Sequence, residues 1–380
     1  MLSTENFVSP PLVTISLEKK RELTKRETEV AGLLSKTIAM EECVYKETYC
    51  EAEVNDSMKS RDDFVSIDQI REAAKAINGY VAYCPLAFSP YFSNQTGKNI
   101  FFKTENFQPT KVFKLRGAIN KVRSLKNAKS VVAASSGNHG LSVAYASRIF
   151  GKRAKIFVPE WANPDKIKSI ISYGAEVVIG GDSYEAAYSE AIKYSKSENS
   201  DFVHPFEDPY VIAGQGTIGL EIYNNMPEID TVIVPVGGGG LISGISIALK
   251  SLSRSVRVIG VQSENNPAMV DAYHGRNTER AIKESIADGM ITKMASSTTL
   301  GIIKKNVDDM VTVTEDEIEK SLLSLLINEH ILVEPSGAAS AAFLLHENAV
   351  LESSKNVAAV LSGGNINIRY LKGLLQRENL

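Results

Sequence analysis

Four consecutive glycines, Gly237, Gly238, Gly239 and Gly240, stand between a run typical of a buried strand (231–236) and an apolar segment typical of a helix. Because glycine has no side chain, backbone N–H groups in such a run can approach a ligand closely. The N-terminus of the following helix adds partial positive charge. The run therefore predicts a phosphate-binding loop, and the alternative is a flexible tight turn. It lacks the Gly-Lys-Ser/Thr of nucleoside triphosphate loops, so that ligand class is not favoured.

A second strand-to-helix turn contains the string SSGNHG at residues 135–140. Its hydroxyls, amide and imidazole surround the start of a helix, where they and the backbone N–H groups can bind a carboxylate. The alternative is that the serine and asparagine side chains only cap the helix.

Lys114, in the string FKLRGA (113–118), is one of 42 basic residues, and a solvated lysine is the default interpretation. A lysine becomes a nucleophile or forms a Schiff base only where its environment lowers its pKa. The sequence does not show that environment directly.

The string GQGTIG (214–219) has the GxGxxG spacing of dinucleotide-binding turns. It follows a proline-containing loop rather than a strand, and the next strand has no acidic residue at its end. A nicotinamide dinucleotide is therefore not favoured.

The segments that must position these motifs alternate between β-like apolar runs and helical patterns. We expect strands over 130–135, 154–159, 176–181, 201–206, 231–236 and 257–262, and helices over 66–77, 141–149, 164–172, 183–194 and 241–252. Strands that alternate with helices of this length predict βαβ units and parallel sheets. The chain is thus expected to be an α/β protein with two sheet domains.

Composition excludes several classes of protein. The 380 residues include 42 Lys+Arg and 45 Asp+Glu, a net charge of −3, and 43% are hydrophobic, which argues against disorder, a fibrous protein and a dedicated nucleic-acid binder. Three cysteines (Cys43, Cys50 and Cys84) without a CxxC motif favour a reducing, cytoplasmic compartment and give no support for zinc. The first residues lack the apolar core of a secretory signal, and no apolar run is long enough to span a membrane.

Together these segments resemble fold-type II pyridoxal-phosphate enzymes of the threonine dehydratase and serine racemase family. The resemblance covers about residues 66–372 and rests on strings in the family's order: ENFQPTKVFKLRGA (105–118), SSGNHG (135–140), AGQGTIGLEI (213–222), VPVGGGGLISGI (234–245), ADGM (287–290), VEPSGAAS (333–340) and LSGGN (361–365). It implies two open parallel-sheet domains of the tryptophan synthase β-like architecture. The implied domains are a large cofactor domain (66–129 and 208–380), a small α/β domain (130–207) and an N-terminal extension of unknown role (1–65).

The resemblance also implies roles for individual residues. Lys114 matches the lysine that forms the Schiff base with pyridoxal 5′-phosphate, and Phe113 matches the aromatic residue beside the pyridine ring. The loop Gly237 to Gly240 matches the 5′-phosphate site, and Ser362 matches the hydroxyl that bonds the pyridine nitrogen.

The turn at 135–140 receives two implied roles. Ser135, Ser136, Asn138 and His139 match the segment that receives the substrate carboxylate, and Asn138 also matches the amide that bonds the ring 3-hydroxyl. Ser136 matches the residue that faces the lysine across the cofactor and acts as a second acid/base in racemases.

The chemistry implied by the resemblance is deamination of L-threonine or L-serine to 2-oxobutyrate or pyruvate and ammonia. Lys114 would remove the α-proton while the cofactor withdraws electrons, and the β-hydroxyl would then leave. The alternatives are a racemase of serine or another amino acid, a lyase for another β-substituted amino acid, and an inactive relative that serves in assembly. The expected partners are a small amino-acid substrate and further copies of the chain in a dimer or tetramer, with no nucleic acid and no membrane.

Two departures from the family pattern bear on these alternatives. Lys111-Val112 stands where many relatives have Gly-Ser. Gln262 and Ala268 replace the acidic residues of metal-binding racemases, although Glu264 could substitute. Hard divalent cations prefer carboxylate oxygens, so we expect no metal, and the racemase interpretation is less favoured.

Overall fold

The computed structural model describes residues 64–276, 281–346 and 349–378. The predicted extension, residues 1–65, therefore lies almost wholly outside the described residues. The elements before the small sheet are α2 (Ile67–Ile77), β1 (Leu86–Phe88), α3 (Pro90–Thr96), β2 (Asn99–Lys103), the 3₁₀ turn η2 (Glu105–Phe107) and α4 (Lys114–Ser124). Helix α2 begins as predicted, because Ser66 and Gln69 form a reciprocal capping box at its N-terminus.

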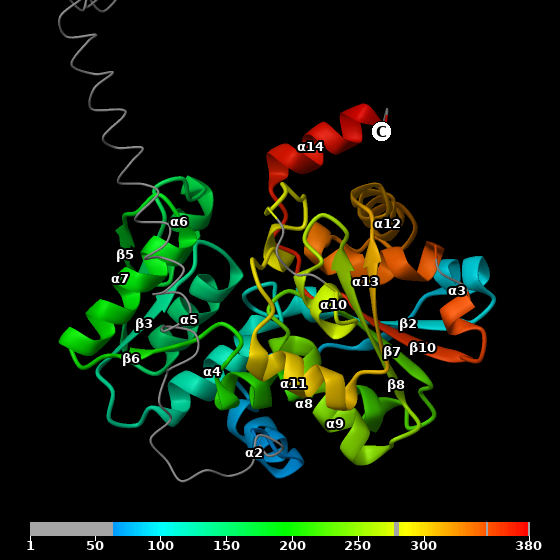
Figure 1. The fold of residues 1–380 in the computed structure, drawn as a ribbon, viewed down its shortest axis with the longest axis horizontal. Helices are drawn as coiled ribbons and strands as arrows, with labels where there is room; N and C mark the ends of the chain where they lie inside the picture. Colours follow the sequence, from blue (N-terminus) through cyan, green and yellow to red (C-terminus); the bar gives the residue numbers. More distant parts are fainter. Residues whose placement is uncertain (1–63, 277–280, 347–348, 379–380) are drawn as a thin grey trace, which may run out of the picture. The chain divides into compact units, whose positions relative to one another are not determined.

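A four-stranded parallel sheet is formed by the middle of the chain, in the strand order β5-β4-β3-β6. Its elements are β3 (Ser130–Ala134), α5 (Asn138–Ile149), β4 (Arg153–Val158), α6 (Pro164–Ser172), β5 (Glu176–Ile179), α7 (Tyr184–Ser197) and β6 (Asp201–Phe202). They are drawn in green in Figure 1. The predicted strand over 201–206 is therefore much shorter than expected, and α5 begins three residues before the predicted start at 141.

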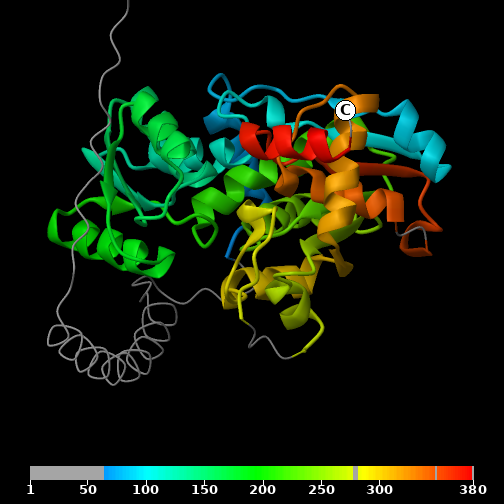
Figure 2. The same cartoon turned by 90° about the horizontal axis from the view of Figure 1, so that it is seen from above.

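A six-stranded sheet has the order β1-β2-β10-β7-β8-β9, in which β1 alone is antiparallel to its neighbour. Its remaining elements are α8 (Pro209–Asn225), β7 (Thr231–Pro235), α9 (Gly240–Leu252), β8 (Arg257–Ser263), α10 (Ala268–Tyr273), η3 (Asp288–Met290), α11 (Ser297–Asn306), β9 (Asp309–Val313), α12 (Glu315–Asn328), α13 (Pro335–His346), η4 (Ala349–Leu351), β10 (Asn356–Val360) and α14 (Ile368–Arg377). Figure 2 shows the two sheets and their helices from above. The two parallel-stranded sheets confirm the predicted α/β class, while the division of the chain at residues 130 and 208 stays a prediction.

The six-stranded sheet is covered on both faces, which explains its nearly continuous apolar strands. On β7, Val232 and Val234 pack with Ile245 and Leu249 of α9, whereas Ile233 faces the opposite cluster with Phe343 of α13. This alternation fixes the register of the strand, because a shift by one residue would exchange its two faces.

The GxGxxG string lies inside helix α8 and not in a strand-to-helix turn. A Cβ on Gly214 would lie 2.7 Å from the Arg116 carbonyl oxygen in α4, and one on Gly216 would lie 2.9 Å from the Gly244 carbonyl oxygen in α9. These glycines therefore allow α4 and α9 to approach α8 closely. The spacing resembles a dinucleotide motif, but in this chain it serves helix packing.

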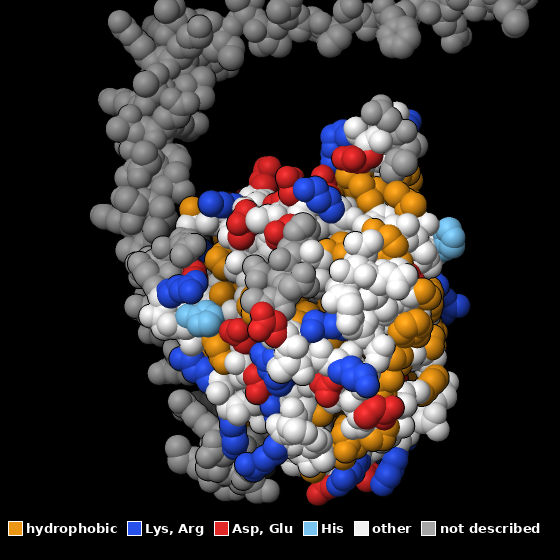
Figure 3. All heavy atoms as spheres, turned by 90° about the vertical axis from the view of Figure 1, so that its right-hand side faces the viewer, with side chains coloured by type: hydrophobic (Ala, Val, Ile, Leu, Met, Phe, Trp, Pro, Cys, Tyr) orange, Lys and Arg blue, Asp and Glu red, His pale blue; other side chains and the backbone are white. Residues whose placement is uncertain are grey.

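No helix among the described residues is both long enough and apolar enough to cross a membrane. On the face drawn in Figure 3, acidic and basic side chains are interspersed rather than gathered by sign. That distribution agrees with the small net charge of the chain.

Candidate active site

Lys114 is the first residue of α4, and the backbone next to it is paired with the segment that follows β10. The Phe113 N–H donates to the Ser362 carbonyl oxygen at 3.0 Å, and the Gly364 N–H donates to the Lys111 carbonyl oxygen at 2.8 Å. The pairing brings Lys114 close to Ser362, although the two are far apart in sequence. The structure thus joins two residues that the sequence assigned to one site.

The environment of Lys114 lowers its pKa to about 8. The residue keeps some accessible surface, but burial of its ammonium group disfavours the charged form, and the nearby Glu334 carboxyl opposes this effect only in part. Its Nζ lies 5.0 Å from the centre of the Phe113 ring. A lysine with this pKa is partly neutral near physiological pH, which is the state that a nucleophile or a general base requires.

A buried ion network fixes the first turn of α4 behind Lys114. Arg116 donates to both oxygens of Glu105, each at 2.8 Å, and to both oxygens of Glu221 at 2.6 and 2.8 Å. Lys103 also donates to Glu221 at 2.5 Å. Buried charges are tolerated when they are paired in this way, and removing one of them leaves its partner uncompensated. The network therefore holds α4 against η2 and α8.

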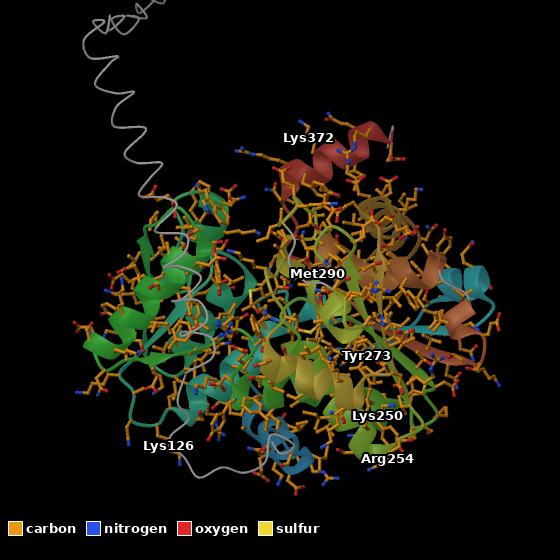
Figure 4. All side chains as sticks on the ribbon, in the orientation of Figure 1. Lys126, Lys250, Arg254, Tyr273, Met290 and Lys372 are labelled. Atoms are coloured by element: carbon orange, nitrogen blue, oxygen red, sulfur yellow. The ribbon has the colours of Figure 1, made fainter. Side chains whose placement is uncertain are left out.

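The loop Gly237–Gly240 connects β7 to α9, as predicted, and close neighbours leave no room for side chains. A Cβ on Gly238 would lie 2.4 Å from the Phe206 ring, and one on Gly240 would lie 2.8 Å from the Phe206 Cβ. Gly239 has a φ of +85°, a conformation that favours glycine. No side chain caps the N-terminus of α9, so its first N–H groups can bind an anion. Met290, labelled in Figure 4, belongs to η3, which packs beside Gly237.

The turn at 135–140 includes the first residues of α5, a helix that has no side-chain cap. Ser135 Oγ accepts a hydrogen bond from the Gly137 N–H at 3.2 Å, and both Ser135 and Ser136 keep some accessible surface. A carboxylate can therefore bind to the first N–H groups of α5 with help from the serine hydroxyls. The alternative considered from the sequence, a turn that only caps its own helix, does not describe this segment.

His139 is buried, and its Nε2 lies 2.7 Å from the Val203 carbonyl oxygen. Because a carbonyl only accepts, Nε2 carries the ring proton. Burial, together with the charge of Lys114, lowers the pKa of His139 to about 3, so the ring is neutral and its Nδ1 can only accept a hydrogen bond. The imidazole therefore offers no positive charge to a carboxylate, and a substrate-binding role for His139 stays a prediction.

Asn138 lies between two residues that the sequence reasoning did not assign to the site, Glu334 and Asn365. Asn138 Nδ2 donates to Glu334 Oε1 at 2.7 Å, and Asn138 Oδ1 accepts from Asn365 Nδ2 at 2.8 Å. Both residues belong to strings that carried the family resemblance. The sequence signal that could have assigned Glu334 to the site is its acidic side chain within the otherwise apolar and small-residue segment 331–344.

Ser362 is buried, and its Oγ is 3.5 Å from the Ser336 carbonyl oxygen, which is too long for a strong hydrogen bond. The hydroxyl is therefore available to a ligand. Lys114, the turn at 135–140, the glycine loop and Ser362 together supply an amine, two anion-binding helix N-termini and a neutral hydroxyl. This donor set fits a phosphorylated aldehyde cofactor together with the carboxylate of an amino acid.

Gln262, which the family resemblance placed where metal-binding racemases have an acidic residue, caps a helix. Its Oε1 accepts from the Met269 and Val270 N–H groups at 2.9 and 3.0 Å, at the start of α10. Within the part of the chain that the structure describes, no cluster of three His, Cys, Asp or Glu side chains could hold a metal ion.

Comparison with known proteins identifies the class to which this fold and site belong. The sequence profile described as "Pyridoxal-phosphate dependent enzyme" matches residues 77–363, so the chain belongs to that family. The predicted family, architecture and pyridoxal-phosphate cofactor are thereby confirmed.

Several similar proteins have names that specify a reaction. L-threonine ammonia-lyase of Thermotoga maritima is 42% identical over 317 residues, which cover 82% of this chain and 79% of that protein. The catabolic L-threonine dehydratase TdcB of Escherichia coli is 40% identical over 310 residues, which cover 80% and 94% of the two chains. Among solved structures, maize serine racemase matches with a TM-score of 0.78 and 31% identity, covering 83% of this chain and 98% of that one.

Proposed function

We propose that the protein is a pyridoxal-phosphate-dependent ammonia-lyase that converts L-threonine, and L-serine, to 2-oxobutyrate or pyruvate and ammonia. The observation that carries this proposal is Lys114. It is a lysine with a pKa of about 8 at the start of α4, placed by backbone pairing beside Ser362. The relatives named L-threonine ammonia-lyase and L-threonine dehydratase support the choice of substrate.

The residues of this chain divide the work of binding. Lys114, Phe113, Asn138, Ser362 and the glycine loop would hold the cofactor. When bound, the cofactor supplies an electron sink for the α-carbon of an amino acid. The N-terminus of α5, with Ser135 and Ser136, would hold the substrate carboxylate.

Lys114 then acts as the base. In its neutral form it accepts the α-proton, and its desolvated surroundings keep that form accessible near neutral pH. Ser362 offers a neutral hydroxyl rather than a carboxylate, so it does not keep the ring nitrogen protonated. Ser362 would thus suit prompt loss of the β-hydroxyl, which needs one proton to leave as water. Addition of water and release of ammonia complete the conversion, so that one threonine gives one 2-oxobutyrate and one ammonia.

The direct test is release of 2-oxo acid from L-threonine and L-serine by purified protein loaded with cofactor. We predict that Lys114→Ala abolishes this release. Lys126→Ala, at an exposed lysine just after α4 (labelled in Figure 4), should retain it. Normal turnover by the Lys114→Ala protein would contradict the assignment.

Racemisation is the second candidate, and the likeness to the maize serine racemase structure favours it. Ser136 would supply the second acid/base, so Ser136→Ala should reduce racemisation more than elimination. Chiral analysis of the same reaction mixtures separates the two activities. Formation of D-serine without 2-oxo acid would replace the lyase proposal.

We also propose that the enzyme is cytoplasmic and assembles as a dimer or tetramer. A free, buried cysteine, Cys84, supports a reducing compartment. Exposed aromatic side chains on and beside the edge strand β1, Tyr83 and Phe88, support burial against a second copy. Light scattering of the purified protein tests the assembly.

A further inference from the structure

Three amide and carboxyl side chains form a continuous hydrogen-bonded chain beside Lys114. Asn365 Nδ2 donates to the Thr110 carbonyl oxygen at 3.0 Å and to Asn138 Oδ1 at 2.8 Å. Asn138 Nδ2 in turn donates to Glu334 Oε1 at 2.7 Å. The chain therefore links the segment before Lys114, the N-terminus of α5, the residue before α13 and the loop after β10.

The partners at each end determine which way the Asn138 amide points. A backbone carbonyl only accepts, so the group of Asn365 that contacts Thr110 must be its NH₂. That NH₂ also faces Asn138, which must present its oxygen there. If Asn138 were flipped, its NH₂ would face the NH₂ of Asn365 and its oxygen would face the oxygens of Glu334. The contact with Asn365 would then be repulsive, and so would the contact with Glu334 in its ionised form.

This orientation leaves one donor for a ligand. The Asn138 NH₂ carries two hydrogens, and Glu334 accepts one of them. The other is held in a fixed place by the hydrogen bonds of Asn138 to Glu334 and Asn365. If Glu334 were replaced by an apolar residue, or Asn365 by an acceptor, the amide could rotate and place its oxygen where the donor had been.

Glu334 is suited to this role because it is buried and closely packed. A Cβ on Gly363 would lie 2.3 Å from Glu334 Oε1, and the Glu334 N–H donates to the Gly363 carbonyl oxygen at 3.0 Å. Burial, reinforced by Asp288 of η3, raises the pKa of Glu334 to about 7 against the opposing effects of Lys166 of α6, the Asn138 hydrogen bond and Lys114 of α4. The carboxyl thus changes its protonation near neutral pH, and its ionised form accepts most strongly from Asn138.

We propose that Glu334 and Asn365 are positioning residues that lock the Asn138 amide with its free N–H toward the ring oxygen of the cofactor. The proposal rests on the function proposed above, because it requires pyridoxal phosphate in this site. It predicts that cofactor affinity depends on Glu334 and Asn365 through the orientation of the Asn138 amide.

The test is equilibrium binding of pyridoxal phosphate to apo protein, followed by visible absorption. Loss of the hydrogen bond from Asn138 to the cofactor should weaken cofactor binding by about tenfold in Glu334→Leu and in Asn365→Asp. Glu334→Gln keeps an acceptor oxygen and should stay within about threefold of wild type. Glu319→Gln is the matched control, because it makes the same change on α12, where Glu319 accepts from Tyr370 and Arg377, and it should bind like wild type.

A pH titration of the bound cofactor's absorption gives a readout that simple loss of structure would not mimic. Wild type should show a step near neutral pH that is absent in Glu334→Gln and present in Glu319→Gln. Thermal unfolding of each apo protein identifies a variant that does not fold. If Glu334→Leu fails in this way, the isosteric variants Asn365→Asp and Glu334→Gln decide the question.

The outcomes separate this inference from the proposed function. Folded variants that bind and titrate like wild type overturn the positioning role and leave the function intact. If the variants bind the cofactor more weakly but the wild-type protein releases no 2-oxo acid, the positioning role is supported and the lyase proposal is overturned. A wild-type protein that never acquires cofactor absorption overturns both.

Discussion

The chemistry of the site depends on how the protein surrounds Lys114. Burial lowers its pKa to about 8, and the carboxyl of Glu334 limits this shift. In the apo protein the neutral fraction should therefore rise as the pH increases through about 8 and then level off. The neutral amine is the form that attacks a carbonyl, so the reactivity of this lysine should follow the same curve.

We predict that labelling of Lys114 in the apo protein by a small acylating reagent has its midpoint at a pH of about 8. Peptide mass spectrometry across a pH series measures the rate, with the exposed Lys126 as the reference in the same digests. A Lys114 curve that coincides with the Lys126 curve would mean that the folded protein does not perturb this amine.

Lys111 adopts a φ of +60°, in the left-handed region that favours glycine. A side chain with a Cβ is disfavoured in this conformation by about 1 kcal/mol. We predict that Lys111→Gly raises the free energy of unfolding by about 0.5–1 kcal/mol, because relief of this strain outweighs the greater freedom of glycine in the unfolded chain. Urea denaturation measures the change. Lys126→Gly, outside the left-handed region, should be neutral or destabilising, and the same result at position 111 would refute the strain argument.

At the scale of elements, the glycines of α8 and α9 set the distance between the helices that carry the site. A Cβ on Gly244 would lie 2.4 Å from the Ile212 carbonyl oxygen and 2.5 Å from the Gly216 nitrogen, both in α8. Backbone atoms of a packed helix cannot move aside as a side chain can. The two helices would have to separate, and α8 also packs against α4, which begins with Lys114.

We therefore predict that Gly244→Ala lowers the free energy of unfolding by about 2–4 kcal/mol, as overpacking of a core does. The matched change is Gly301→Ala in α11, where nothing lies within 4 Å of the added Cβ. That variant should gain about 0.5–1 kcal/mol from helix propensity. Denaturant unfolding should show a lower free energy of unfolding for Gly244→Ala and a higher one for Gly301→Ala. An unchanged free energy of unfolding in Gly244→Ala would show that α8 and α9 are not in tight contact.

Sequence periodicity predicted the strands β3, β4, β7 and β8 and the N-terminus of α2, because buried parallel strands and a Ser-x-x-Gln box have local signatures. It predicted a strand through residue 206, but β6 ends at Phe202. Beyond this point His204 Nδ1 accepts from the Glu207 N–H at 2.8 Å, a turn that apolar content alone does not reveal. Glu334 and Asn365 were not predicted in the site, since their roles depend on contacts between segments that are distant in sequence.

At the scale of the whole molecule, the site draws its parts from both sheets. The turn at 135–140 follows β3 of the four-stranded sheet, and the glycine loop follows β7 of the six-stranded sheet. Lys166 of α6 forms an ion pair with Asp288 of η3, and this pair connects the elements around the two sheets. Gly289, the next residue, donates its N–H to Ser336 Oγ at 3.1 Å, and its carbonyl oxygen is a close neighbour of Gly237. The ion pair therefore links the four-stranded sheet, whose turn would hold the substrate carboxylate, to the six-stranded sheet, whose glycine loop would hold the cofactor phosphate.

We predict that Lys166→Met raises the KM for threonine by about two- to fivefold, because a partly exposed ion pair contributes up to about 1 kcal/mol. The free energy of unfolding should change by no more than about 1 kcal/mol, the most that such a pair contributes. Lys168→Met is the control on the same helix, since Lys168 pairs with exposed Asp165 one turn away. Steady-state kinetics of the single variants and of the exchanged pair Lys166→Asp with Asp288→Lys decide the matter. If the exchanged pair restores the KM, the attraction between the charges at positions 166 and 288 causes the effect. If Lys168→Met raises the KM equally, the net charge of α6 causes it instead.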